Sequence, residues 1–175
     1  RGDDAKSLCF DGDVLTDALD IVGAPVVRLT LSSDKPLAQI AVRLCCVDET
    51  GASSRITYGV LNLCCRGSVE FPEPLMPGKA YDIVLRLDDV AYRVPKGRRL
   101  RLSVSNAYWP MIWPSPERAV LELLAGRVEI PVRAEAAGGE ADFEAPEAAP
   151  PWRIDKLREP SNLREFSSDP QSGES

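Results

Sequence analysis

Apolar and polar residues alternate in short stretches along the first 133 residues of the chain. Within 26–33, for example, Val27, Leu29 and Leu31 alternate with polar or charged neighbours, which is the period-two pattern of a strand with one buried face. Turn signals separate such stretches about every 8–12 residues, as in all-β domains. The pattern predicts no helix, and it predicts strands at 7–10, 26–33, 39–48, 55–65, 81–88, 90–94, 100–105, 119–124 and 127–132.

These strands predict an all-β fold, a jelly-roll β-sandwich of two antiparallel sheets. The clearest hairpin joins 39–48 to 55–65, and a last hairpin is expected around Ala125 and Gly126. Gly59 lies inside a predicted strand, which indicates a bulge or a close backbone contact. The prolines of 70–78 favour an extended surface loop there.

The alternation stops after Ser105, where two Trp-Pro pairs and Pro116 follow. Proline fixes φ and cannot donate to a strand ladder, so this part of the 97–117 stretch predicts a stiff loop. Leaving a large apolar side chain in water costs roughly 1.5–3 kcal/mol, so the loop is expected to cover its own domain's end, a ligand or a neighbouring domain. The candidate interface or ligand-facing residues are Tyr108, Trp109, Met111, Ile112 and Trp113.

The charge is unevenly spread and suggests three segments. Acids and bases balance within 1–133, so the net charge of −6 comes from the rest of the chain. We expect a sandwich domain at 1–133, an acidic Ala/Glu/Pro linker at 134–151, and a tail at 152–175 that is partly docked, disordered or a truncated further element. Trp152, Ile154 and Leu157 are the tail's isolated apolar anchors. A neutral domain with an acidic tail argues against nucleic acid or an anionic membrane as partner.

The composition limits the chemistry that the chain can perform. Histidine is absent, which excludes every His-based catalytic arrangement, and the sequence has no nucleophile-elbow, phosphate-loop or dinucleotide-binding motif. We expect no metal and no cofactor. Five cysteines without a Cys-x-x-Cys pattern favour reduced, mostly buried thiols in a cytoplasmic protein. Two alternatives remain open: zinc held by Cys45, Cys46, Cys64 and Cys65, and calcium held by Asp11, Asp13, Asp17 and Asp20.

Several motifs in order resemble a known family. Gly23-Ala24-Pro25, Val42-Arg43-Leu44, Gly59-Val60-Leu61, Pro77-Gly78 and the stretch from Gly97 to Ser103 are similar to the C-terminal domain of X-Pro dipeptidyl-peptidases and of cocaine-esterase-like (CocE/NonD) hydrolases. The resemblance covers about residues 5–133. It implies a non-catalytic, galactose-binding-like jelly roll preceded by an α/β-hydrolase domain with a Ser-Asp-His triad that cleaves amides or esters. Arg98 departs from the His that is frequent in the family after the preceding glycine.

Three functions follow as hypotheses. The first is an accessory module that packs on the missing hydrolase domain and shapes its active-site side, unless the two Trp residues of the loop merely plug the sandwich end. The second is a carbohydrate- or ligand-binding module, which fold analogy alone suggests. The third is an enzyme in its own right, which we do not expect because Asp88 and Asp89 are adjacent in a predicted strand and point to opposite faces. Homo-oligomerisation is a further expectation, because isolated sandwiches expose edges and apolar patches.

Overall fold

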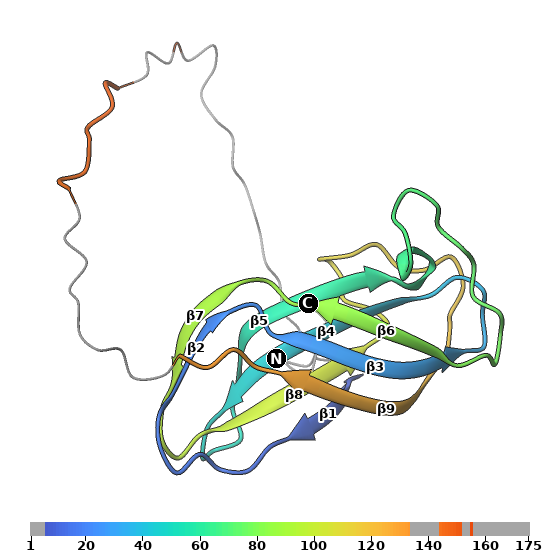
Figure 1. Ribbon diagram of the computed structural model, residues 1–175, viewed down its shortest axis with the longest axis horizontal. Helices are drawn as coiled ribbons and strands as arrows, with labels where there is room; N and C mark the ends of the chain where they lie inside the picture. Colours follow the sequence, from blue (N-terminus) through green and yellow to red (C-terminus); the bar gives the residue numbers. More distant parts are fainter. Residues whose placement is uncertain (1–5, 134–143, 152–154, 156–175) are drawn as a thin grey trace, which may run out of the picture. The chain divides into compact units, whose positions relative to one another are not determined.

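The computed structural model describes residues 6–133, 144–151 and 155. The chain divides into two units, Arg1–Ala137 and Gly138–Ser175. All the strands of the described residues lie in the first unit, and every pairing between them is antiparallel (Figure 1). Within the second unit, 144–151 forms neither helix nor strand. The predicted linker residues 134–143 and the tail anchors Trp152, Ile154 and Leu157 lie outside the described residues.

The largest sheet has four strands in the order β1-β8-β4-β5. Strand β4 lies between β8 and β5, and it is almost wholly buried on both of its faces. Its core-facing residues include Ile40, Val42 and Leu44. The strands of this sheet are β1 (Leu8–Asp11), β8 (Arg99–Ser105), β4 (Gln39–Val47) and β5 (Ser53–Asn62).

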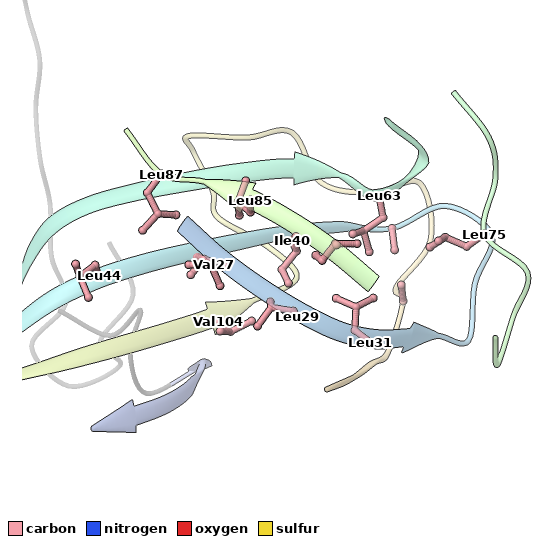
Figure 2. Close-up of a cluster of buried hydrophobic side chains, with 14 of the residues drawn as sticks. Val27, Leu29, Leu31, Ile40, Leu44, Leu63, Leu75, Leu85, Leu87 and Val104 are labelled. Atoms are coloured by element: carbon pink, nitrogen blue, oxygen red, sulfur yellow. The ribbon is translucent and has the colours of Figure 1, made fainter. Parts of the chain in front are cut away.

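A three-stranded sheet in the order β6-β3-β9 and a two-stranded sheet of β2 and β7 complete the domain. Figure 2 shows Val27, Leu29 and Leu31 of β3 packing with residues of β4 and β8 in one buried cluster. The domain is therefore an antiparallel β-sandwich with a single apolar core. The remaining strands are β2 (Leu19–Gly23), β3 (Val26–Ser33), β6 (Tyr81–Arg86), β7 (Val90–Val94) and β9 (Leu121–Glu129).

The all-β prediction and most predicted strands are confirmed, including 26–33 and 90–94 at their predicted bounds. The jelly-roll and galactose-binding-like details remain predictions.

The turn after β4 is built by Asp48, whose carboxylate accepts hydrogen bonds from the Thr50 N–H, the Thr50 hydroxyl and the Ala52 N–H at 2.6–2.9 Å. Gly51 completes the turn at φ +86°, a conformation that favours glycine.

The prediction of a final hairpin around Ala125 and Gly126 is wrong, because β9 runs through both residues as one strand beside β3. A register shift between Thr30 and Leu31 leaves Leu124 as an extra residue in β9. Because of this bulge, the core-facing residues of β9 change from odd-numbered to even-numbered positions. The interrupted alternation of apolar and polar residues looks, in the sequence, like a turn between two strands.

Two smaller differences concern strand bounds. The predicted strand 55–65 ends at Asn62, whose side chain accepts a hydrogen bond from the Cys64 N–H and begins a short 3-10 turn, Leu63–Cys65. Strand β2 was not predicted, because its residues follow an acid-rich stretch that favoured a loop.

Gly59 makes the close contact that its position in a strand predicted. A Cβ atom at this position would lie 2.9 Å from Leu87 Cδ2 and 3.1 Å from the Arg86 carbonyl oxygen. The Asp88 N–H donates to the Tyr58 carbonyl oxygen at 2.9 Å, and the Thr57 hydroxyl donates to the Asp88 carbonyl oxygen at 2.7 Å. These contacts join β5 to the segment after β6 and close this side of the sandwich.

Candidate functional site

The tryptophan loop, residues 106–120, leaves β8 and crosses to the start of β9. The Asn106 side-chain amide donates to the Ala119 carbonyl oxygen at 2.6 Å, which ties the two ends of the loop together. The Ile112 N–H donates to the Tyr108 carbonyl oxygen at 2.9 Å, and Trp109-Pro110 is a cis peptide. The loop is therefore a structured element with its own internal bonds.

Tyr108 anchors this loop to the four-stranded sheet. Its side chain is 8% exposed, and its hydroxyl accepts a hydrogen bond from the Arg55 guanidinium. The Arg43 guanidinium carbon lies 4.9 Å from the centre of the Tyr108 ring, and the Tyr58 ring meets it edge-on at 5.8 Å. Cation–π and aromatic pairs of this kind each contribute about 0.5–1.5 kcal/mol, so the aromatic ring holds the loop in place.

Trp109 and Trp113 point away from the domain. They are 61% and 80% exposed, and their rings meet edge-to-face with centres 5.5 Å apart and planes at 71°. Met111 is half exposed, whereas Ile112 is partly buried. The two indoles therefore do not plug the end of the sandwich. Of the five predicted candidates, Tyr108 and Ile112 face the domain, while Trp109, Met111 and Trp113 face outward.

The turn at 34–38 and the loop at 66–80 lie with the tryptophan loop at the same end of the sandwich (Figure 1). The turn at 34–38 connects the other two loops. The Gln39 side-chain amide, just after the turn, donates to the Trp113 carbonyl oxygen at 2.9 Å, and the Leu75 N–H donates to the Pro36 carbonyl oxygen at 2.8 Å. Lys35 also pairs with Glu117 at 3.5 Å. We call this surface the loop end; its exposed apolar residues are Leu37, Val69, Phe71, Met76, Trp109, Met111, Trp113 and Val120.

Sequence reasoning missed the contribution of the 66–80 loop to this surface. Val69, Phe71 and Met76 are apolar residues in a proline-rich loop, the same signal that identified the tryptophan loop. The loop is held by Arg66, whose guanidinium donates to the Glu73 carbonyl oxygen at 2.6 Å and lies over the Tyr81 ring at 4.3 Å. What the sequence did not contain was the adjacency of the two loops, which is a property of the fold.

The described residues hold no group of three His, Cys, Asp or Glu that could bind a metal. Cys45 and Cys46 lie in β4, and Cys64 lies in the 3-10 turn; all three are buried and form no disulfide, whereas Cys9 is exposed and its sulfur lies 3.4 Å from the Ser103 hydroxyl oxygen. Asp11 pairs with Arg101 at 2.6 Å rather than joining the acidic side chains that follow it. No helix in the described part of the chain has the length and apolar character needed to cross a bilayer.

Asp88 and Asp89 were predicted to be adjacent in a strand, but the structure places both in the segment between β6 (Tyr81–Arg86) and β7 (Val90–Val94). The Asp89 carboxylate receives two hydrogen bonds from Arg86, at 2.8 and 3.0 Å, and the Asp88 backbone joins β5. The loop end presents exposed apolar side chains, and charged residues of its loops pair with each other, as Lys35 with Glu117 and Arg66 with Glu73. Its chemistry suits contact with another apolar surface.

Comparison with known proteins identifies the family of this β-sandwich. Residues 1–147 match the family described as the X-Pro dipeptidyl-peptidase C-terminal non-catalytic domain. A Rhodopirellula baltica protein, named provisionally as an Xaa-Pro dipeptidyl-peptidase, is 28% identical over 109 residues, which are 57% of this chain and 17% of that protein. The chain thus spans about a sixth of this curated relative.

Three solved structures share the fold. An α-amino acid ester hydrolase matches with a TM-score of 0.66 at 20% identity over 73% of this chain and 26% of that chain. An aminopeptidase from a marine sediment Thaumarchaeota archaeon matches with a TM-score of 0.65 at 18% identity, over 74% of this chain and 26% of that chain. A CocE/NonD family hydrolase from Staphylococcus aureus matches with a TM-score of 0.60 at 13% identity, over 75% of this chain and 31% of that chain. In each, the sandwich is a minor part of a longer protein. The chain belongs to the family of X-Pro dipeptidyl-peptidase C-terminal non-catalytic domains.

Proposed function

We propose that this chain is the accessory domain of a serine hydrolase and that its loop end packs against the α/β-hydrolase domain of the same protein. The family description, a non-catalytic C-terminal domain, supports the presence of a catalytic domain earlier in the protein. The cleavage of X-Pro peptides or of esters by that domain is part of the proposal. The accessory domain supplies shape and contact, and the catalytic groups come from its partner.

The exposure of Trp109 and Trp113 is the observation that carries this proposal. Two indoles at 61% and 80% exposure, beside other apolar side chains, form an apolar surface of the kind that marks a contact site. Tryptophan is also the residue most often found at energetic centres of protein interfaces. The loop is held by Tyr108 and Asn106, so these indoles are presented at little further cost in conformational freedom.

The carbohydrate-binding alternative is less well supported. A sugar ring stacks on an exposed aromatic face, and a platform for several rings needs coplanar aromatics. The Trp109 and Trp113 planes meet at 71°, so the edge of one ring points at the face of the other and the two rings are not coplanar. This geometry favours insertion of a paired wedge into an apolar pocket over stacking along a glycan.

The test compares the full-length protein that carries this chain with the variant Trp109→Ser/Trp113→Ser. Loss of two interface indoles should cost about 2 kcal/mol or more of domain–domain contact. We expect calorimetry to show the two domains unfolding at separated temperatures and kcat/KM for an aminoacyl-proline or ester substrate to fall. In this chain alone the same double substitution should change stability by about 1 kcal/mol or less, because both side chains are exposed and lose mainly their contact with each other.

The matched control is Val84→Ser on β6, an apolar side chain of similar exposure away from the loop end. It should leave the unfolding profile and kcat/KM of the full-length protein unchanged. If the double tryptophan variant of the full-length protein behaves like this control, the loop end is not the domain contact.

A further inference from the structure

The side of the sandwich opposite the Gly59 contact is open. There, an apolar groove of about 490 Å³ runs between β1 and β8 on one rim and β9 on the other. Phe10 occupies a core-facing position of β1, opposite Leu102 of β8, yet it is 51% exposed. The apolar residues of the groove, which we call the edge groove, include Phe10, Leu100, Leu102, Leu123, Leu124 and Ile130.

The bulge in β9 shapes this groove. Because Leu124 is the extra residue, both it and Leu123 line the groove, and Leu124 remains 52% exposed. An ordinary strand would send two consecutive side chains to opposite faces. Gly126 allows β9 to approach β3 closely, since a Cβ there would lie 2.7 Å from Leu29 Cδ2. Two apolar side chains are thus directed at an opening that the described residues leave uncovered.

The charged residues at the rims are already paired within the domain. Asp11 receives hydrogen bonds from Arg101 at 2.6 and 2.9 Å, and Arg127 pairs with Glu129 at 3.2 Å. An occupant therefore needs apolar side chains rather than compensating charge. The groove and the loop end are linked by β9, which begins directly after Val120 and lines the groove from Leu123 onward.

We propose that the edge groove is a second docking surface, filled by apolar side chains of the domain that precedes this one in the same protein; the inference rests on the proposed function. Strand β1, which forms one rim, is the first strand among the described residues, so a domain earlier in the same protein would be joined to this one on the side of the groove. A tethered domain binds at an effective concentration in the millimolar range, whereas a second copy must first meet the groove from solution. One domain reaching from the loop end along β9 covers both apolar surfaces.

Hydrogen exchange measured on the full-length protein and on this chain alone tests the proposal. Peptides from β1 and β9 should exchange at least about tenfold more slowly in the full-length protein, since covered strands open less often. Leu124→Arg in the full-length protein should restore the rates of the chain alone. Val84→Arg, on the outer side of β6, is the matched control and should leave the protection intact.

The melting temperature of each variant in the chain alone identifies a folding defect, and Phe10→Asp repeats the test from the opposite rim. Equal exchange of β1 and β9 in the two proteins overturns the proposal. So does protection that appears in the chain alone and rises with its concentration, because the occupant would then be a second copy. The tryptophan variant distinguishes this proposal from the proposed function. If Trp109→Ser/Trp113→Ser leaves the domains coupled while Leu124→Arg abolishes the protection of β1 and β9, only the loop end is ruled out as a contact. If the tryptophan variant uncouples the domains while Leu124→Arg leaves the protection intact, only the edge groove is ruled out.

Discussion

At the scale of single residues, Asp11 fastens the edge strand β1 to β8. The Arg101 guanidinium donates to both carboxylate oxygens, at 2.6 and 2.9 Å. These hydrogen bonds, together with the positive charges of Arg101 and Arg99, lower the pKa of Asp11 below its ordinary value of 3.8, and partial burial opposes them. An aspartate whose pKa is lower in the folded state stabilises that state whenever it is ionised.

Asp11→Asn should therefore lower the free energy of unfolding at neutral pH by about 0.2–1 kcal/mol, the usual range for a partly exposed ion pair. The contribution is fully present above the ordinary pKa of 3.8 and is lost as the pH falls through the lower folded-state pKa. Urea unfolding of both proteins from pH 7 down to acid should show the two stabilities converging. Asp13→Asn, in the exposed loop after β1, is the control; a difference that grows in acid would contradict this assignment.

The tryptophan loop shows what single residues reveal in advance. Proline spacing and composition located the loop and its apolar residues. They did not separate the anchor Tyr108 from the outward Trp109 and Trp113, because a loop has no period that fixes side-chain direction. That separation depends on Arg55 and Tyr58, which approach Tyr108 from a strand some fifty positions away in the sequence.

At the scale of elements, β9 departs from simple alternation for a physical reason. Leu121 and Leu123 pack against the core before the bulge, and Val128 and Ile130 do so after it. The core-facing positions thus change from odd to even numbers at Leu124. Strands without such a change, such as β3 and β7, were predicted at their observed bounds, whereas β9 was divided in two.

Gly126→Ala tests the close approach of β9 to β3. The added methyl group would lie 2.7 Å from Leu29 Cδ2, so the strands must separate or Leu29 must leave its rotamer. Overpacking of this kind costs about 1–3 kcal/mol. Gly67→Ala is the control, because nothing lies within 4 Å of a Cβ at that position. Thermal unfolding of both variants measures the difference, and equal stabilities would show that β9 accommodates the methyl group freely.

At the scale of the whole molecule, the described residues offer two apolar surfaces. We expect the chain to hydrolyse neither an aminoacyl-proline anilide nor a simple ester by itself. Histidine is absent from the chain, and the described residues hold no group of three His, Cys, Asp or Glu that could bind a metal. Turnover measured with the purified chain, and retained after treatment with a serine-directed inhibitor, would place a catalytic site of another class within it.

The sandwich could be predicted from the sequence because a strand with one buried and one solvent-facing side alternates apolar and polar residues with a period of two. It could not predict which side of the sandwich closes. Closure depends on Gly59 meeting Leu87, and the opening depends on β1 and β9 standing at the free edges of their sheets. Both are contacts between segments that are distant in the sequence, and no local pattern encodes them.

The extra residue in β9 also has a consequence for sequence change over time. A one-residue deletion in most strands turns every later side chain to the wrong face. Loss of Leu124 alone would instead restore strict alternation, with Gly126, Val128 and Ile130 keeping their inward positions. Gaps in related sequences should therefore collect at this position, and a homologue with such a gap would retain the sandwich while its edge presents one leucine fewer.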